Sequence, residues 1–189
     1  MHQDDLWQAF DINGARADTT GYRAYNGNPD LGDDAFVGTV SLWLYRYNDG
    51  EIEILFQQRS PKVTNGGKWD VSAGGHINNN EDNISAMVRE AREEIGAKID
   101  PSKLEFIFRI RSLHNKQMFN NFYIYDWGKH SSNFKFDDGE VSQVKWVKLS
   151  EFDDFVDKNT KDVIKNNQFT RTMTKFWLER KQSDGNITQ

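Results

Sequence analysis

The hydrophobic and polar positions follow a two-residue period along much of the chain after residue 35, and this pattern predicts β-strands. Residues 36–47 are rich in β-branched and aromatic side chains. In residues 51–58, Ile52, Ile54 and Phe56 occupy alternate positions and have polar neighbours. An Asn-Asp-Gly turn precedes this run. Two such runs joined by a glycine-containing turn are typical of a β-hairpin. Further strands are expected over residues 69–72, over the alternating residues 104–110, and over residues 118–125 and 141–149.

Between residues 83 and 96 the apolar positions recur instead with the 3.6-residue period of an amphipathic helix. Asp82 or Asn83 is the expected N-cap, and Gly96 lies where a glycine commonly ends a helix. Two more helical segments are expected between residues 150 and 180. The apolar residues that define these three helices are Ile84, Met87, Val88, Ala91 and Ile95, then Phe152, Phe155 and Val156, then Met173, Phe176 and Trp177.

The two ends of the chain lack these periodic patterns. Residues 1–35 are rich in Asp, Asn, Gly and Thr around one apolar island near Trp7 and Phe10, and we expect an extension packed on the edge of the domain. Residues 181–189 are expected to form a polar tail. The remaining strands and helices, residues 36–180, predict one domain with an α+β fold or an α/β/α sandwich.

Composition narrows the functional classes. The chain has 189 residues with 24 basic and 29 acidic side chains, a net charge of −5, so the basic surplus of a general nucleic-acid binder is missing. Zero cysteines exclude disulfides, thiolate metal sites and a cysteine nucleophile. The acidic opening does not resemble a signal peptide, and no apolar run is long enough for a membrane span. We therefore expect a soluble cytoplasmic protein that binds neither polymeric nucleic acid nor membranes.

The predicted helix over residues 83–95 carries three carboxylates on one patch. Glu90, Glu93 and Glu94 lie at positions i, i+3 and i+4, which are neighbours on a helix surface. Neighbouring arginines can neutralise such a patch on an ordinary solvated helix. A divalent cation can do so as well, and oxygen ligands alone favour Mg²⁺ or Mn²⁺.

The surrounding sequence resembles the Nudix box of the Nudix hydrolase superfamily. Gly75 is followed after five residues by Glu81, and after seven more by Arg-Glu-Ala-Arg-Glu-Glu-Ile-Gly-Ala at residues 89–97. These residues fill every fixed position of the 23-residue pattern. The strand order is also similar, over roughly residues 36–160. The resemblance implies a Nudix-type α/β/α sandwich with a mixed sheet, in which a loop–helix–loop segment holds divalent metal ions.

The resemblance also implies roles for individual residues. Glu90, Glu93 and Glu94 match the metal-binding glutamates, Arg89 matches an arginine that orients them, and Glu81 matches a glutamate with an indirect role. The carbonyl of Gly74 is a candidate metal ligand. Glu140 is either a further metal ligand or general base, as in other family members, or an ordinary loop acid beside Asp137 and Asp138.

The implied activity is Mg²⁺-dependent hydrolysis of a diphosphate linkage, with Glu94 or Glu140 accepting a proton from the attacking water. Nucleoside diphosphate derivatives are the default substrates. Isoprenoid or other non-nucleotide diphosphates are an alternative, and so is a non-catalytic Nudix-fold sensor of a metabolite. Many family members dimerise, so a homodimer is among the states that the resemblance allows.

The segment before the box is similar to Nudix proteins of the isopentenyl-diphosphate-isomerase-like branch. The similarity lies in residues 57–60, Gln-Gln-Arg-Ser, and residues 67–76, Gly-Lys-Trp-Asp-Val-Ser-Ala-Gly-Gly-His. The isomerase itself needs a catalytic cysteine, which this chain lacks, so a hydrolase is expected. His76 is either a metal or phosphate contact or a loop histidine. Arg59, Lys62 and Lys68 are either phosphate contacts or ordinary surface residues.

Overall fold

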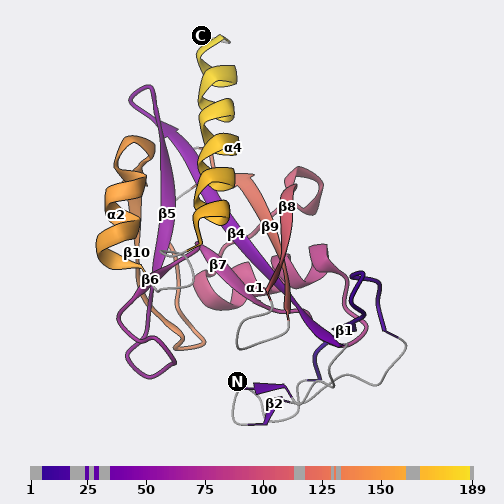
Figure 1. Cartoon of the computed structure of the whole chain (residues 1–189). Helices are drawn as coiled ribbons and strands as arrows, with labels where there is room; N and C mark the ends of the chain where they lie inside the picture. The colour runs from indigo at the N-terminus through magenta and orange to yellow at the C-terminus, as the bar shows by residue number, and fades with distance from the viewer. Residues whose placement is uncertain are drawn as a thin grey trace.

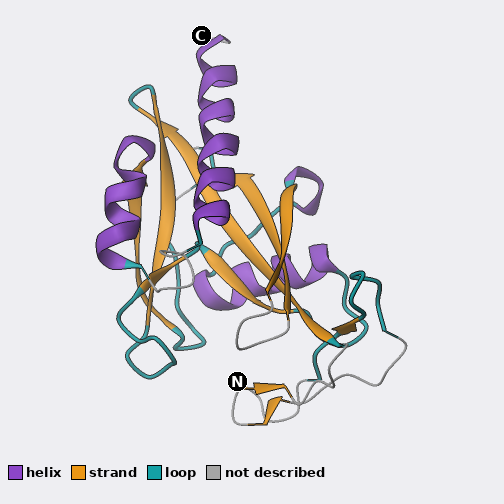
Figure 2. Ribbon diagram, in the orientation of Figure 1, coloured by secondary structure: helices purple, strands orange, loops and turns teal. Residues whose placement is uncertain are grey.

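The structure is a computed structural model that describes residues 6–17, 24–25, 28–29, 35–112, 118–128, 130, 133–160 and 167–187. Figures 1 and 2 show its strands and helices. The strands are β1 (Ala9–Phe10), β2 (Ala24–Tyr25), β3 (Asn28–Pro29), β4 (Phe36–Asn48), β5 (Glu51–Arg59), β6 (Trp69–Asp70), β7 (Ala73–His76), β8 (Glu105–Ser112), β9 (Met118–Asp126) and β10 (Val141–Lys148). The helices are α1 (Asn83–Ile95), α2 (Phe152–Asn159) and α4 (Gln168–Ile187), with short 3-10 helices η1 (Pro101–Lys103) and η2 (Leu149–Glu151).

The main sheet is mixed. Its strand order is β10-β5-β4-β9-β8, and β1, β6 and β7 add short pairings to β4 and β5. Of the neighbouring pairs in that order, only β4 and β9 are parallel, with Val37 opposite Met118 and Tyr45 opposite Asp126. Strands β2 and β3 pair separately with each other. The expected α+β fold with a mixed sheet is confirmed.

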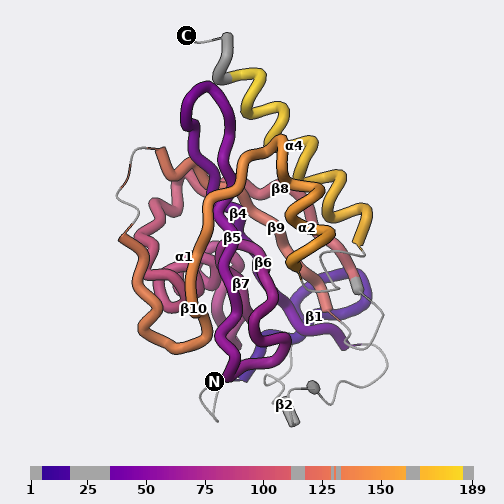
Figure 3. The backbone as a smooth tube through the Cα atoms, turned by 90° about the vertical axis from the view of Figure 1, so that its left-hand side faces the viewer, coloured from indigo at the N-terminus to yellow at the C-terminus, as the bar shows by residue number. Residues whose placement is uncertain are grey.

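Helices cover both faces of the main sheet, as the side view in Figure 3 shows. Helix α1 packs on one face, over a core that includes Leu42 and Leu55. Helices α2 and α4 pack on the other face, where Trp43 is fully buried beside Phe152. The expected α/β/α sandwich is therefore the observed architecture.

The sheet divides near its centre, and this division makes room for the segment before α1. Strand β4 pairs with β5 at Tyr45 but with β7 at Leu42. Where the two partners separate, the buried hydroxyl of Ser72 accepts a hydrogen bond from the Leu44 N–H at 2.8 Å and donates to the Leu55 carbonyl at 2.6 Å. The side chain thus replaces the missing strand pairing, and β7 enters beside β4 in direct contact with α1.

The strict alternation expected in two strands is wrong, because helices cover both faces of the sheet at β5 and because the register of β8 shifts. In β5, Leu55 and Gln57 are as deeply buried as Ile54. In β8, the register shifts between Phe106 and Phe108, so Ile107 is buried and Phe106 is 54% exposed.

The C-terminal helix also differs from the expectation. Phe176, expected as an anchor, is 51% exposed, whereas Thr174 and Leu178 are fully buried. Residues 181–187, expected to lie in a polar tail, form the last turns of α4. No helix among the described residues is both long and apolar enough to cross a lipid bilayer.

The N-terminal segment contributes to the fold directly. Strand β1 pairs with the start of β4, with Ala9 opposite Val37. Trp7 and Phe10 are buried. Residues 6–17 therefore lie against the domain, beside the loop that leads from β7 to α1.

Candidate active site

Helix α1 begins and ends at the residues that the sequence indicates. The Asp82 carboxylate accepts a hydrogen bond from the Ser85 N–H at 2.8 Å, which is N-cap geometry. Gly96 ends the helix in the left-handed conformation, with φ 67°. The buried apolar positions, such as Met87 and Ala91, fix the rotation of the helix against the sheet. This rotation places Glu90 and Glu94 toward the strands and leaves Glu93 more exposed.

Gly75 permits the close approach between β7 and α1. A Cβ atom at this position would lie 2.3 Å from the Glu90 carboxylate. Any side chain here would displace Glu90, so the glycine of the motif is required by the packing of the carboxylate.

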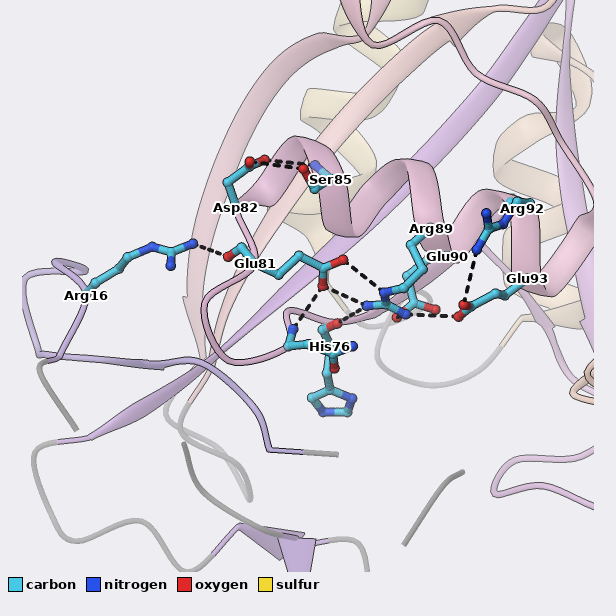
Figure 4. Close-up of polar contacts among 10 residues, drawn as sticks. Arg16, His76, Glu81, Asp82, Ser85, Arg89, Glu90, Arg92 and Glu93 are labelled. Carbon is cyan, nitrogen blue, oxygen red and sulfur yellow. Dashed lines mark hydrogen bonds and ion pairs between the residues drawn. The ribbon is translucent and has the colours of Figure 1, made fainter. Parts of the chain in front are cut away.

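Arg89 lies at the centre of an ion-pair network between α1 and the preceding loop (Figure 4). Its guanidinium donates to both carboxylate oxygens of Glu81 at 3.0 Å. It also donates to Glu90 at 2.8 Å, to Glu93 at 3.0 Å and to the His76 carbonyl at 2.8 Å. Burial opposes the charge of Arg89, but the bonded carboxylates outweigh burial and raise its pKa above the ordinary value. Arg89 therefore links the β7–α1 loop to two of the helix glutamates.

Glu94 is the most deeply buried acid of the site, with 3% of its surface exposed. Its Oε2 atom accepts hydrogen bonds from the Gly74 N–H at 2.8 Å and from Gln57 Nε2 at 3.1 Å. Burial raises the pKa of Glu94 well above its usual value, and the charge of Glu90 adds to this effect. The Gly74 hydrogen bond acts in the opposite direction. Two strands, β5 and β7, thus hold one oxygen of this carboxylate.

Several further acids lie within electrostatic range of one another. The pKa of Glu90 is raised to about 7, mainly by burial, with smaller raising effects from Glu93 and Glu140 and an opposing effect from Arg89. Asp70 and Glu140 also contribute to the raised pKa of Glu94. Carboxylates that are both desolvated and close to like charges favour a compensating cation.

The chemistry of this donor set suits a divalent metal ion. The donors are carboxylate oxygens, which Mg²⁺ and Mn²⁺ prefer. Within the described residues, no three such side chains already converge closely enough to enclose an ion. Arg89 binds one oxygen of Glu90 and one of Glu93, which leaves the other oxygen of each carboxylate able to bind an ion.

The other residues singled out from the sequence lie around this centre. The main chain of Glu140 immediately precedes β10, and its carbonyl accepts a hydrogen bond from the Ser60 N–H at 2.7 Å. Arg59 donates to the Thr64 carbonyl at 2.8 Å and pairs with Asp70 at 3.6 Å. Lys68 is exposed on the same loop.

His76 stacks on Trp7 of the N-terminal segment. The two ring centroids are 3.6 Å apart and the planes are nearly parallel. Its carbonyl oxygen accepts the hydrogen bond from Arg89 described above. This geometry gives His76 a packing role between residues 6–17 and the site.

A family model described as the NUDIX domain matches residues 36–172. The chain belongs to the Nudix family. An uncharacterized Nudix hydrolase from Clostridium acetobutylicum is 28% identical over 125 residues, which are 63% of this chain. The match spans 60% of the length of that relative.

Several solved structures have the same fold. DR0079 from Deinococcus radiodurans superposes with a TM-score of 0.65 at 19% identity, covering 85% of this chain and 95% of that protein. A Caenorhabditis elegans Ap4A hydrolase gives 0.53 at 20% identity, covering 74% and 94%. The Nudix domain of Shewanella oneidensis NrtR, solved with ADP-ribose, gives 0.53 at 20% identity, covering 65% and 81%.

Sequence reasoning did not assign a role at the Nudix centre to Gln57 or Asp70. Both side chains are buried, at 1% and 3% exposure. Gln57 donates a hydrogen bond to Glu94, and the charge of Asp70 contributes to the raised pKa of Glu94. The available signal in the sequence was a polar residue among the apolar residues of a predicted strand, since a polar group that becomes buried needs a specific partner.

Proposed function

We propose that this protein is a divalent-metal-dependent Nudix hydrolase that cleaves the diphosphate linkage of a nucleoside diphosphate derivative or a similar small molecule. The observation that carries the proposal is the meeting of buried Glu94 with Glu90 and the Arg89 network, where β7 contacts α1. Nucleotide chemistry is supported by two fold neighbours, the Ap4A hydrolase and the domain solved with ADP-ribose.

Mg²⁺ is the proposed ion, and Mn²⁺ is expected to substitute for it. The proposed ligands are Glu90, Glu93, Glu94 and the Gly74 carbonyl. When bound, the ion would neutralise phosphate charge, polarise phosphorus and make a coordinated water more acidic. The network around Arg89 would hold the loop and the helix together and orient Glu90 and Glu93 while their other oxygens bind the ion.

The reaction forms a bond between a water oxygen and phosphorus while the bond from phosphorus to the bridging oxygen breaks. The proton of the attacking water goes to a carboxylate, for which we propose Glu94 or Glu140. Gln57 and Gly74 hold the Oε2 atom of Glu94, which fixes the direction of its other oxygen. Arg59, Lys68 and His76 stay candidates for contacts with the substrate.

The test is a screen of nucleoside diphosphate derivatives and isoprenoid diphosphates, with and without Mg²⁺, with products identified by phosphorus NMR. Glu93→Gln and Glu94→Gln each remove a charged ligand while keeping side-chain size. We expect each to lower kcat/KM by about 10²-fold or more. The matched control is Glu151→Gln, an exposed glutamate before α2, which should leave the rate unchanged.

Full activity in both site variants would contradict the proposed roles of these glutamates. Saturable binding of a nucleotide without turnover of any panel member, in the presence of Mg²⁺, would favour the sensor over the enzyme.

A further inference from the structure

The loop between β7 and α1 forms hydrogen bonds with residues that precede the matched family region, residues 36–172. The Gln8 N–H donates to the Ile77 carbonyl at 2.8 Å, and the Asn79 N–H donates to the Leu6 carbonyl at 2.7 Å. These two main-chain bonds make the N-terminal segment a short antiparallel partner of the loop.

Side chains add to this pairing at the same place. Gln8 is buried, with 4% of its surface exposed. Its Oε1 atom accepts hydrogen bonds from the Asn80 N–H at 3.3 Å and from Arg16 Nη1 at 3.1 Å. The other guanidinium nitrogen, Nη2, donates to the main-chain carbonyl of Glu81 (Figure 4). Arg16 therefore bridges Gln8 and the residue whose carboxylate binds Arg89.

A continuous chain of contacts leads from the N-terminal segment to the helix glutamates. Arg16 holds the main chain of Glu81, and the Glu81 carboxylate accepts two hydrogen bonds from Arg89. Arg89 in turn binds Glu90 and Glu93. The same loop is fixed a second time through His76, which stacks on the buried ring of Trp7 and bonds Arg89 through its carbonyl.

We propose that residues 6–17 are part of the catalytic unit, with Arg16 as a positioning residue that sets the Glu81–Arg89 pair and thereby the glutamates that receive the metal. This inference rests on the proposed function. It assigns a role to a segment that the family match does not include. Arg16 acts through Glu81 and touches neither substrate nor metal.

The geometry explains why an arginine suits this position. Two acceptors, Gln8 Oε1 and the Glu81 carbonyl, receive hydrogen bonds from different nitrogens of one planar guanidinium. The fixed fork of Arg can serve both at once, whereas a lysine ammonium is a single point of charge. Arg16 itself is exposed, so its replacement removes these bonds without opening the core.

The experiment compares Arg16→Ala and Arg16→Lys with Arg111→Ala. Arg111 is the matched control because its Nη1 donates to a main-chain carbonyl of the same segment, that of Ile12 at 3.1 Å, away from Glu81. Three measurements are made on the full chain: amide hydrogen exchange of residues 77–81, Mn²⁺ binding without substrate by electron paramagnetic resonance, and the Mg²⁺ concentration that gives half-maximal hydrolysis.

For Arg16→Ala we expect faster exchange in the loop and a Mn²⁺ affinity weakened several-fold, up to about tenfold, which is the lower end of the effect of losing an outer-shell partner. The half-maximal Mg²⁺ concentration should rise by the same factor at unchanged thermal stability. Arg16→Lys should recover part of the loss, and Arg111→Ala should behave as wild type.

Unchanged loop exchange and Mn²⁺ affinity in Arg16→Ala would overturn the positioning role. An equal loss in Arg111→Ala would overturn it too, because the effect would then come from loosening the segment as a whole. Weaker Mn²⁺ binding in Arg16→Ala alone, in a protein that hydrolyses no member of the panel, would support the positioning role and contradict the proposed function.

Discussion

Glu94 shows how one carboxylate is shaped by residues that are distant in sequence. Its helix neighbours set its spacing to Glu90 and Glu93, but its burial and its hydrogen bonds come from Gln57 on β5 and Gly74 on β7. The spacing could be predicted because it depends only on the helical period. The burial could not, since it depends on where the sheet divides and which polar residue β5 turns toward α1.

Gly75 offers a test of the site that separates activity from stability. In Gly75→Ala, the new methyl group would meet the Glu90 carboxylate at 2.3 Å, which is the mobile end of a side chain. We expect Glu90 to move, so that Mn²⁺ affinity falls by about tenfold or more while the melting temperature changes little. Calorimetric titration and thermal unfolding measure the two quantities.

Gly38→Ala provides the contrast. Its Cβ would lie 2.3 Å from the Phe10 ring and 2.7 Å from Ile77, both packed in the core. Overpacking of this kind costs about 1–3 kcal/mol of unfolding free energy. If Gly75→Ala lost a similar amount of unfolding free energy, the Glu90 side chain would be unable to move away from the new methyl group, contrary to this prediction.

At the scale of elements, helix α4 is fixed to α2 by a cluster of ion pairs. Asp153 of α2 binds Arg171 of α4 at 3.0 Å and Lys175 at 2.7 Å, and Asp157 binds Arg171 at 2.7 Å. The Lys175 hydrogen bond, together with Arg171, lowers the pKa of Asp153 below its ordinary value of 3.8.

Because the folded state lowers this pKa, the stabilisation by Asp153 is present above pH 3.8 and is lost as the pH falls through the lowered value. Asp153→Asn should therefore lower the unfolding free energy near pH 7 by about 0.5–1 kcal/mol, a modest effect because the carboxylate is half exposed. The difference from wild type should disappear in strong acid. Urea unfolding at several pH values measures this.

Asp154→Asn is the control for this cluster, since Asp154 pairs only with Lys158 within α2 among the contacts found in the described residues. If Asp154→Asn lost as much unfolding free energy at neutral pH as Asp153→Asn, the ion pairs between α2 and α4 would contribute no more stability than the pair within α2.

The elements themselves were predicted best where one face is buried and the caps are explicit. Helix α1 begins after Asp82 and ends before Gly96, as its periodicity and capping residues indicate. Strand alternation failed in β5 because helices cover both faces of the sheet, so Leu55 is buried on the α1 side while Ile54 and Phe56 are buried on the other. It failed in β8 because a register shift places Ile107 in the same core as Phe108. Single-strand periodicity does not reveal that a second layer is present.

At the scale of the whole molecule, the acidic centre links metal binding to global stability. A cation that binds only the folded protein stabilises it by about 2.7 kcal/mol at a hundred times its Kd. For a chain of this size we expect a rise in Tm of roughly 5–10 °C with saturating Mg²⁺ or Mn²⁺. Scanning calorimetry measures the rise, with sodium chloride at equal ionic strength as the control.

Glu94→Gln should remove most of this rise. An equal rise in the variant would mean that the ions act elsewhere on the acidic surface, and would contradict a metal site formed by Glu94 and its neighbours.

The overall architecture was predictable because a long motif identified the family fold, and the family resemblance supplied the roles of the glutamates. The packing of the N-terminal segment on the domain edge was expected, but the contacts of residues 6–17 with the site were not predictable. Only the apolar island near Trp7 and Phe10 stands out there, and nothing in the sequence shows that Gln8 and Arg16 reach the loop before α1.

The pairing of β1 with β4 also limits where this protein can be truncated. A fragment limited to residues 36–172 would lose the main-chain partner of Phe36 and Val37 and the buried rings of Trp7 and Phe10. It would also lose residues 173–187 of α4, which include Leu178. Its central strand would end in an unpaired, apolar edge of the kind that promotes aggregation. We therefore expect the cooperative folding unit to extend beyond the region that the family model matches.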